Sequence, residues 1–122
     1  MNIKKFSEQT GISAHTLRYY EKIGLIRGVR RNASGHREYS DADLRWVDFI
    51  KRLKSMGMAL ENIQKYADLR EQGEETSKER MEILQNHVEV LEKRIFEEQE
   101  NMKRLINKIE VYQAYLDDQK GS

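Results

Sequence analysis

A seven-residue repeat of apolar residues in the second half of the chain constrains the fold most. Its two series together comprise Met81, Leu84, Val88, Leu91, Ile95, Met102, Leu105, Ile109, Tyr112 and Leu116, with Glu98 standing where one more apolar residue would be expected. A repeat sustained over five heptads predicts a long coiled-coil helix. From about residue 77 to 118, this helix would be roughly 60 Å long at 1.5 Å per residue.

Such a helix cannot bury its apolar stripe by itself, and the remainder of the chain is too short to cover it. A partner helix is therefore required, and a homodimer is the simplest source, so the ten apolar residues of the repeat are the predicted dimerisation residues. Glu98 could meet a basic residue of the other chain, such as Lys103, Arg104 or Lys108. We expect the dimerisation helix to span residues 74–118 and residues 119–122 to form a disordered tail.

The first half of the chain begins with two short predicted helices. The first spans residues 3–10, and the second begins after Ser13, a good N-cap, and ends at Gly24, a good residue to follow a helix. On a helical period, Leu17 and Tyr20 lie on one side of the second helix. Its other side carries His15, Arg18, Tyr19 and Lys22. This pattern predicts a helix-turn-helix whose second helix reads a DNA major groove. The alternative is that the basic strip is only a solvent-exposed helix face.

A short hairpin is predicted after the second helix. Residues 32–35, Asn-Ala-Ser-Gly, have turn chemistry, and the flanks 29–31 and 36–39 can pair as two strands. A hairpin that follows a helix-turn-helix is a wing, which reaches phosphates or the minor groove beside the reading helix. The alternative is a solvated basic loop.

Two further helices complete a predicted four-helix head spanning residues 1–73. Ser40 and Asp43 form a capping-box pattern at the start of the third helix, which ends near Gly57. The fourth helix spans about residues 60–72. Trp46 and Phe49 of the third helix are expected in the core rather than in a ligand cage. The predicted fold is mainly α, a winged helix-turn-helix head followed by a coiled-coil helix.

Charge and composition narrow the function. Residues 1–57 carry 12 Lys and Arg against 6 Asp and Glu, whereas the remainder carries 10 against 15, which indicates a nucleic-acid-binding head on a solvated stalk. The chain has no cysteine and three scattered histidines, so no cofactor or metal site is expected. We find no signal peptide or membrane span and expect a cytoplasmic protein. No nucleophile–base pair, carboxylate pair or phosphate loop indicates an enzyme.

These residues resemble the MerR family of bacterial transcription regulators. The likeness rests on Thr16-Leu-Arg-Tyr-Tyr-Glu-Lys-Ile-Gly-Leu-Ile26, on the wing Arg31-Asn-Ala-Ser-Gly-His-Arg-Glu-Tyr39, and on Ser40 to Leu44, Phe49 to Met58 and Glu61 to Ile63. The rear half is most similar to the branch that senses aldehydes and related electrophiles, through residues 64–73 and 108–112. That branch commonly uses a cysteine in the helix containing Phe49, which is absent here, so thiol sensing is excluded.

The resemblance implies how the protein works. DNA contacts would come from Thr16, Arg18 and Tyr19, with Tyr20 beside them, and from Arg37 and Tyr39 of the wing. His15 is added from the outward face of the reading helix. The family also implies an antiparallel coiled coil between two long helices. Its mechanism implies binding of double-stranded DNA at a palindromic promoter site, with distortion of an over-long spacer that lets RNA polymerase engage both promoter elements.

The competing interpretation is a coiled-coil interaction or assembly protein in which the head is an adaptor. The basic face of the reading helix distinguishes the two, because an adaptor would not need it. We therefore favour a homodimeric, sequence-specific DNA-binding regulator of transcription. The inducer, the operator and the direction of regulation do not follow from the sequence.

Overall fold

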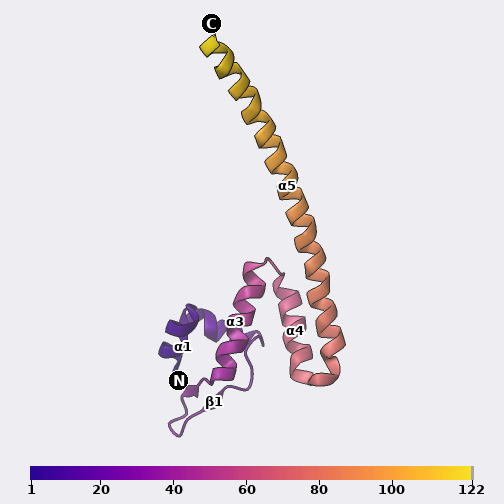
Figure 1. Cartoon of the computed structure of the whole chain (residues 1–122). Coiled ribbons are helices and arrows are strands. Elements are labelled where there is room, and N and C mark those ends of the chain that lie inside the picture. Colours follow the sequence, from indigo (N-terminus) through magenta and orange to yellow (C-terminus); the bar gives the residue numbers. More distant parts are fainter. Residues whose placement is uncertain (122) are drawn as a thin grey trace. The chain divides into compact units, whose positions relative to one another are not determined.

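The computed structural model of the chain describes residues 1–121 and is mainly helical (Figure 1). Its elements are helices α1 (Ile3–Thr10) and α2 (Ala14–Lys22), strands β1 (Arg30–Arg31) and β2 (Arg37–Glu38), helices α3 (Asp41–Ser55) and α4 (Leu60–Gln72), the 3₁₀ turn η1 (Glu74–Thr76) and helix α5 (Ser77–Gly121). Two compact units are present, Met1–Leu84 and the part that starts at Gln85. The predicted fold class, mainly helical with a small hairpin and a long C-terminal helix, is confirmed, while the pairing of that helix in a coiled coil stays a prediction.

The helix-turn-helix forms where the sequence predicted it. The Ser13 hydroxyl accepts a hydrogen bond from the Thr16 amide at 3.1 Å, which satisfies one of the free amide groups at the start of α2. Gly24 follows the helix with φ of +81°, a conformation that residues with a Cβ rarely adopt. The Leu25 amide donates a hydrogen bond to the Tyr20 carbonyl at 2.8 Å, and this bond directs the chain toward the wing.

The wing is a two-stranded antiparallel hairpin with Arg30 opposite Glu38 and Arg31 opposite Arg37. The Asn32 side chain closes its turn, because its oxygen accepts from the amides of Ser34 and His36 at 3.0 and 3.1 Å. The predicted hairpin is thus confirmed, although its regular strands are only two residues long.

One hydrophobic core joins all elements of the head. Phe6, Leu17, Val47, Ile50 and Ile63 are fully buried in it, and they come from α1, α2, α3 and α4. These residues are the inward faces of four amphipathic helices, so their burial supplies most of the driving force for packing the head.

Trp46 belongs to this core, as predicted. Its indole N–H donates to the Leu25 carbonyl at 2.7 Å, and its ring stacks on Tyr66 with the centroids 6.0 Å apart. The Arg70 guanidinium lies 4.3 Å from the Trp46 ring centroid and covers its outer side. Phe49 is half-buried beside both rings.

The head is longer than the predicted span of residues 1–73. Figure 1 shows α4 turning at η1 into the start of α5. The buried Thr76 hydroxyl donates to the Leu69 carbonyl at 2.6 Å, and Ile83 and Leu84 pack against the core of the head. The compact unit therefore ends at Leu84, because the first turns of α5 contribute apolar contacts that composition alone did not reveal.

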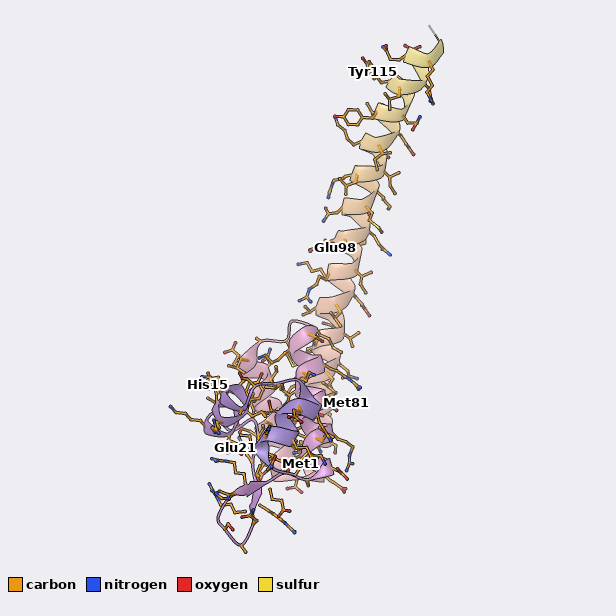
Figure 2. All side chains as sticks on the ribbon, turned by 90° about the vertical axis from the view of Figure 1, so that its left-hand side faces the viewer. Met1, His15, Glu21, Met81, Glu98 and Tyr115 are labelled. Carbon is orange, nitrogen blue, oxygen red and sulfur yellow. The ribbon has the colours of Figure 1, made fainter. Side chains whose placement is uncertain are left out.

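The second unit is the continuous helical segment of α5 that begins at Gln85. Its heptad residues stand largely open to solvent, with exposed fractions from 50% at Val88 to 66% at Leu105. Only Leu91 among them is half-buried. The helix continues to Gly121, beyond the predicted end at residue 118, because nothing in residues 119–121 forces it to stop; Ser122 lies outside the described residues. Figure 2 shows Glu98 and Tyr115 projecting from this segment.

Further apolar side chains lie outside the repeat. Val90, Phe96, Ile106, Val111 and Tyr115 are each exposed by 46% or more, so the apolar surface of α5 is wider than the seam that the heptads predicted. Across the described residues, no helix is long and apolar enough to cross a membrane.

Ser40→Ala should lower the free energy of unfolding by about 1 kcal/mol. Ser40 and Asp43 exchange two capping hydrogen bonds at 2.9 and 3.1 Å, and alanine removes one of them. The measurement is the urea midpoint at one fixed protein concentration. Ser34→Ala is the control, because Ser34 uses its backbone amide rather than its side chain in the wing turn. Equal midpoints for the two variants would contradict the capping role.

Candidate nucleic-acid interface

The outward face of α2 is basic and aromatic. His15, Arg18, Tyr19 and Lys22 are exposed on it, and the exposed fraction of Tyr19 is 47%. Leu17 and Tyr20, on the opposite face, are buried, so the helix is oriented by its apolar side. Thr16 is half-buried, and its hydroxyl oxygen lies 3.0 Å from that of Ser13. Figure 2 shows His15 on the outside of the head.

A hollow of about 460 Å³ opens between the start of α1, helix α2 and the wing. Its lining includes the basic residues Lys4, Arg18, Arg31, His36 and Arg37. Such a lining attracts anions, and a phosphate group is the anion that fits a surface beside a reading helix. Lys4 carries no signal for this role in the sequence, because its approach to the wing arises only when α1 packs beside the hairpin.

Glu21 connects α2 with the wing. Its side chain is only 16% exposed, and one carboxylate oxygen lies 2.5 Å from Nε of Arg37. The other oxygen accepts a hydrogen bond from the Tyr39 hydroxyl at 3.0 Å. The Tyr39 ring in turn stacks on Phe6, with centroids 4.1 Å apart and planes 6° from parallel. Helix α2, the returning strand of the wing and α1 are thus joined at one place.

The structure separates the predicted DNA-contacting residues into two sets. His15, Thr16, Arg18 and Tyr19 lie on or beside the open face of α2. Tyr20, Arg37 and Tyr39 instead have their polar groups engaged within the head: the Lys54 ammonium donates to the Tyr20 hydroxyl at 2.6 Å, and Glu21 holds the other two. Their direct contact with DNA stays a prediction, and the geometry gives them a structural role first.

The environment of Tyr39 changes its titration. Burial, the hydrogen bond to Glu21 and the negative charge of Glu21 raise the pKa of Tyr39 from 10.0 to about 12, although Arg37 and Arg18 act in the opposite direction. The hydroxyl therefore stays protonated at every physiological pH and remains a donor to Glu21.

Among residues 1–121, no group of His, Cys, Asp or Glu is arranged to hold a metal ion.

A helix-turn-helix with a basic outward face, followed by a wing that shares a cationic hollow with it, defines a winged helix-turn-helix protein. Residues 1–69 match the family described as MerR HTH family regulatory protein, and residues 44–108 match the family described as MerR, DNA binding. The chain belongs to the MerR family of DNA-binding transcriptional regulators, as the resemblance indicated.

Known relatives support this assignment along nearly the whole chain. The HTH-type transcriptional regulator AdhR of Bacillus subtilis (strain 168) is 42% identical over 84 residues, which are 69% of this chain and 60% of that protein. This chain thus matches less than two thirds of the length of AdhR. A MerR family transcriptional regulator from Listeria monocytogenes has a solved structure that is 41% identical, with a TM-score of 0.85 over 95% of this chain and 88% of that one.

A third relative was solved on DNA. HiNmlR, a MerR family regulator lacking the sensor domain, bound to promoter DNA, is 35% identical with a TM-score of 0.79, over 92% of this chain and 89% of that chain. The similarity therefore extends beyond the head to the helix that follows it.

Tyr39 should titrate with a pKa of about 12. Because the pKa is raised on folding, the stabilisation from neutral Tyr39 is complete below pH 10 and is lost as the pH rises toward 12. Glu21→Gln should lower the pKa of Tyr39, since it removes a charge and weakens a hydrogen bond that favour the neutral phenol. Ultraviolet absorbance of tyrosinate measures this, and subtraction of the Tyr39→Phe titration isolates Tyr39 from the other five tyrosines. An unchanged pKa in Glu21→Gln would contradict the role of Glu21.

Proposed function

We propose that two copies of this chain form a homodimer that binds promoter DNA of two-fold symmetry and regulates transcription from it. The observation that carries the proposal is the open basic face of α2 beside the cationic hollow of the wing. In this arrangement α2 enters the major groove, with His15, Thr16, Arg18 and Tyr19 toward base edges and phosphates. The solved complex of HiNmlR with promoter DNA supports the same use of the similar head here.

The exposed stripe of α5 supports the proposed dimer. Seven heptad residues of the stripe, from Val88 to Leu116, are at least half exposed in the single chain. Water contact over a continuous apolar surface of this length is unfavourable, and a second α5 would bury it along its whole length. The antiparallel arrangement that the resemblance implied places the two heads at opposite ends of the paired helices. A two-fold axis between the heads then calls for a palindromic site.

The effect on transcription would be exerted through the shape of DNA. Two heads held at a fixed separation can bend and untwist the promoter spacer, so that RNA polymerase engages both promoter elements. The free energy for this deformation would come from phosphate contacts of both heads. RNA polymerase is thus an indirect partner in the proposal.

The exposed stripe would equally serve a coiled-coil assembly protein, which is the second candidate. That candidate leaves the basic face of α2 and the lined hollow of the wing without a role. Sequence-selective binding of DNA therefore separates the two functions. A duplex selected from a random pool by the wild-type protein provides the operator for this test.

Arg18→Ala should weaken binding to the selected operator by roughly 1–3 kcal/mol and relax its sequence preference. The reason is that Arg18 is exposed on α2 and also lines the hollow. Fluorescence anisotropy of a labelled duplex at fixed salt measures the affinity. Lys93→Ala, which removes one positive charge from an exposed position of α5 outside the heptad repeat, is the control. Equal affinities of Arg18→Ala and the wild type for the operator would refute the assignment.

Leu105→Asp should convert the dimer to a monomer at micromolar concentration. A carboxylate in the seam would be buried without a partner, and a penalty of roughly 3 kcal/mol raises the dissociation constant about a hundredfold. Phe96→Asp is the matched control, because Phe96 is exposed by 61% against 66% for Leu105 but lies outside the heptad repeat. Light scattering measures the mass. A Leu105→Asp protein that remains dimeric would show that the repeat is not the interface.

A further inference from the structure

An acidic residue is unexpected on the reading helix of a DNA-binding protein. Glu21 follows Arg18, Tyr19 and Tyr20 directly in α2, and a carboxylate there would repel phosphates if its charge were unopposed. The structure shows that the charge is opposed, because Arg37 contacts it from β2 at 2.5 Å. The acid and the base together are close to neutral, so neither contributes its full charge to the surface that faces DNA.

Glu21, Arg37 and Tyr39 together link α2 to the wing, and we call these three residues the clasp. Arg37 of β2 and Tyr39, which directly follows β2, each bind a different oxygen of the same carboxylate, at 2.5 and 3.0 Å. Two bonds to one rigid group restrain the strand in rotation as well as in distance. Figure 2 shows Glu21 on the side of the head where the wing emerges.

The clasp has firm supports on both sides. Tyr39 is buried, stacks on Phe6, and its amide donates to the Met1 carbonyl at 2.7 Å. Glu21 itself is held by α2, whose inward residues Leu17 and Tyr20 are in the core. The two-residue strands of the wing have few ladder bonds of their own, and a short hairpin is marginal without tertiary contacts. The wing therefore relies on tertiary contacts for its orientation, and the contacts of Glu21 are the ones that join it to α2.

We infer that Glu21 is a positioning residue that fixes the wing against the reading helix through Arg37 and Tyr39 without touching DNA itself. The inference rests on the proposed function, since a fixed wing matters only when α2 and the wing bind one stretch of DNA together. It assigns Arg37 to the clasp rather than to a phosphate. Arg18, Arg31 and Lys4 then remain as cations of the hollow for the DNA backbone.

The test compares Glu21→Ala, Arg37→Ala and the double variant, each in the full chain. The measured quantity is the ratio of affinity for the selected operator to affinity for a random duplex of equal length. This ratio largely cancels the gain or loss of one net charge, which alters both affinities together. Glu38→Ala is the matched control, because Glu38 is an exposed acid on the same strand.

If the clasp positions the wing, Glu21→Ala and Arg37→Ala should each lower the ratio of operator affinity to random-duplex affinity by roughly tenfold. The double variant should lose no more than either single one, because both break the same link. The dependence of log affinity on log salt should keep its slope in Arg37→Ala, and Glu38→Ala should keep the wild-type ratio. A direct phosphate contact by Arg37 predicts the opposite pattern: Glu21→Ala binds all DNA more tightly, Arg37→Ala binds less tightly, and the slope falls by about 0.9. That pattern would overturn the inference.

A measurement without DNA keeps the inference independent of the proposed function. Hydrogen exchange of the Asn32 amide, which bonds to the His36 carbonyl at 2.8 Å, reports on opening of the wing. Exchange should be faster in Glu21→Ala and unchanged in Glu38→Ala. Exchange should also be faster in Glu21→Gln, a variant that keeps the side-chain volume and so serves if Glu21→Ala folds poorly. Unchanged exchange in both Glu21 variants would refute the clasp. Failure of the wild type to select any duplex would refute the proposed function instead.

Discussion

The apolar stripe of α5, which its own chain leaves uncovered, is the constraint on which the architecture depends. The head buries its four helices around one core and extends only as far as Leu84 along α5. Beyond that point, side chains such as Ile95, Leu105 and Ile109 are exposed by more than half. Covering this stripe is favourable because it removes apolar surface from water, and in the proposed function a second α5 covers it. Two heads, two-fold symmetry and a palindromic DNA site are successive consequences of that pairing in the proposed function.

Within the head, much of the basic character counted from the sequence is used to hold the fold together. The Lys51 ammonium donates to the Thr10 carbonyl, and Lys54 donates to the Tyr20 hydroxyl. Arg27 pairs with Asp68 of α4. These contacts tie α3 to the helix-turn-helix and tie the segment after α2 to α4. The net charge of the first half therefore overstates the charge that can reach a phosphate, and the hollow beside the wing is a better guide to the binding surface.

Aromatic side chains fix how the head is assembled around α2. The Phe6–Tyr39 stack joins α1 to the base of the wing, and Trp46 holds the segment after α2 through the Leu25 carbonyl. Trp46 also stacks on Tyr66 of α4, so the same residue connects the segment after α2 to α4. A buried ring that carries one polar atom is suited to such a place, because it supplies both apolar area and a directed bond.

The sequence by itself determined the elements of this protein and their inward faces. Caps at Ser13 and Ser40, the turn at Asn32 to Gly35 and the periodicity of Leu17 and Tyr20 are local signals, and local signals are sufficient to start, end and orient a helix or hairpin. The heptad repeat was readable for the same reason. Resemblance in the motif around Arg18 and Tyr19 indicated the family. Direct DNA contacts by individual residues remain predictions.

Only the tertiary structure decided which polar groups meet. Glu21, Arg37 and Tyr39 are separated by up to 18 residues along the chain, and no period or motif relates their side chains until the wing folds back on α2. The position of Lys4 beside the wing likewise depends on packing. So do the apolar contacts of Ile83 and Leu84 with the head, which extend its compact unit beyond residue 73. The physical reason is that hydrogen bonds and ion pairs depend on distances of a few ångströms, which packing sets and periodicity does not.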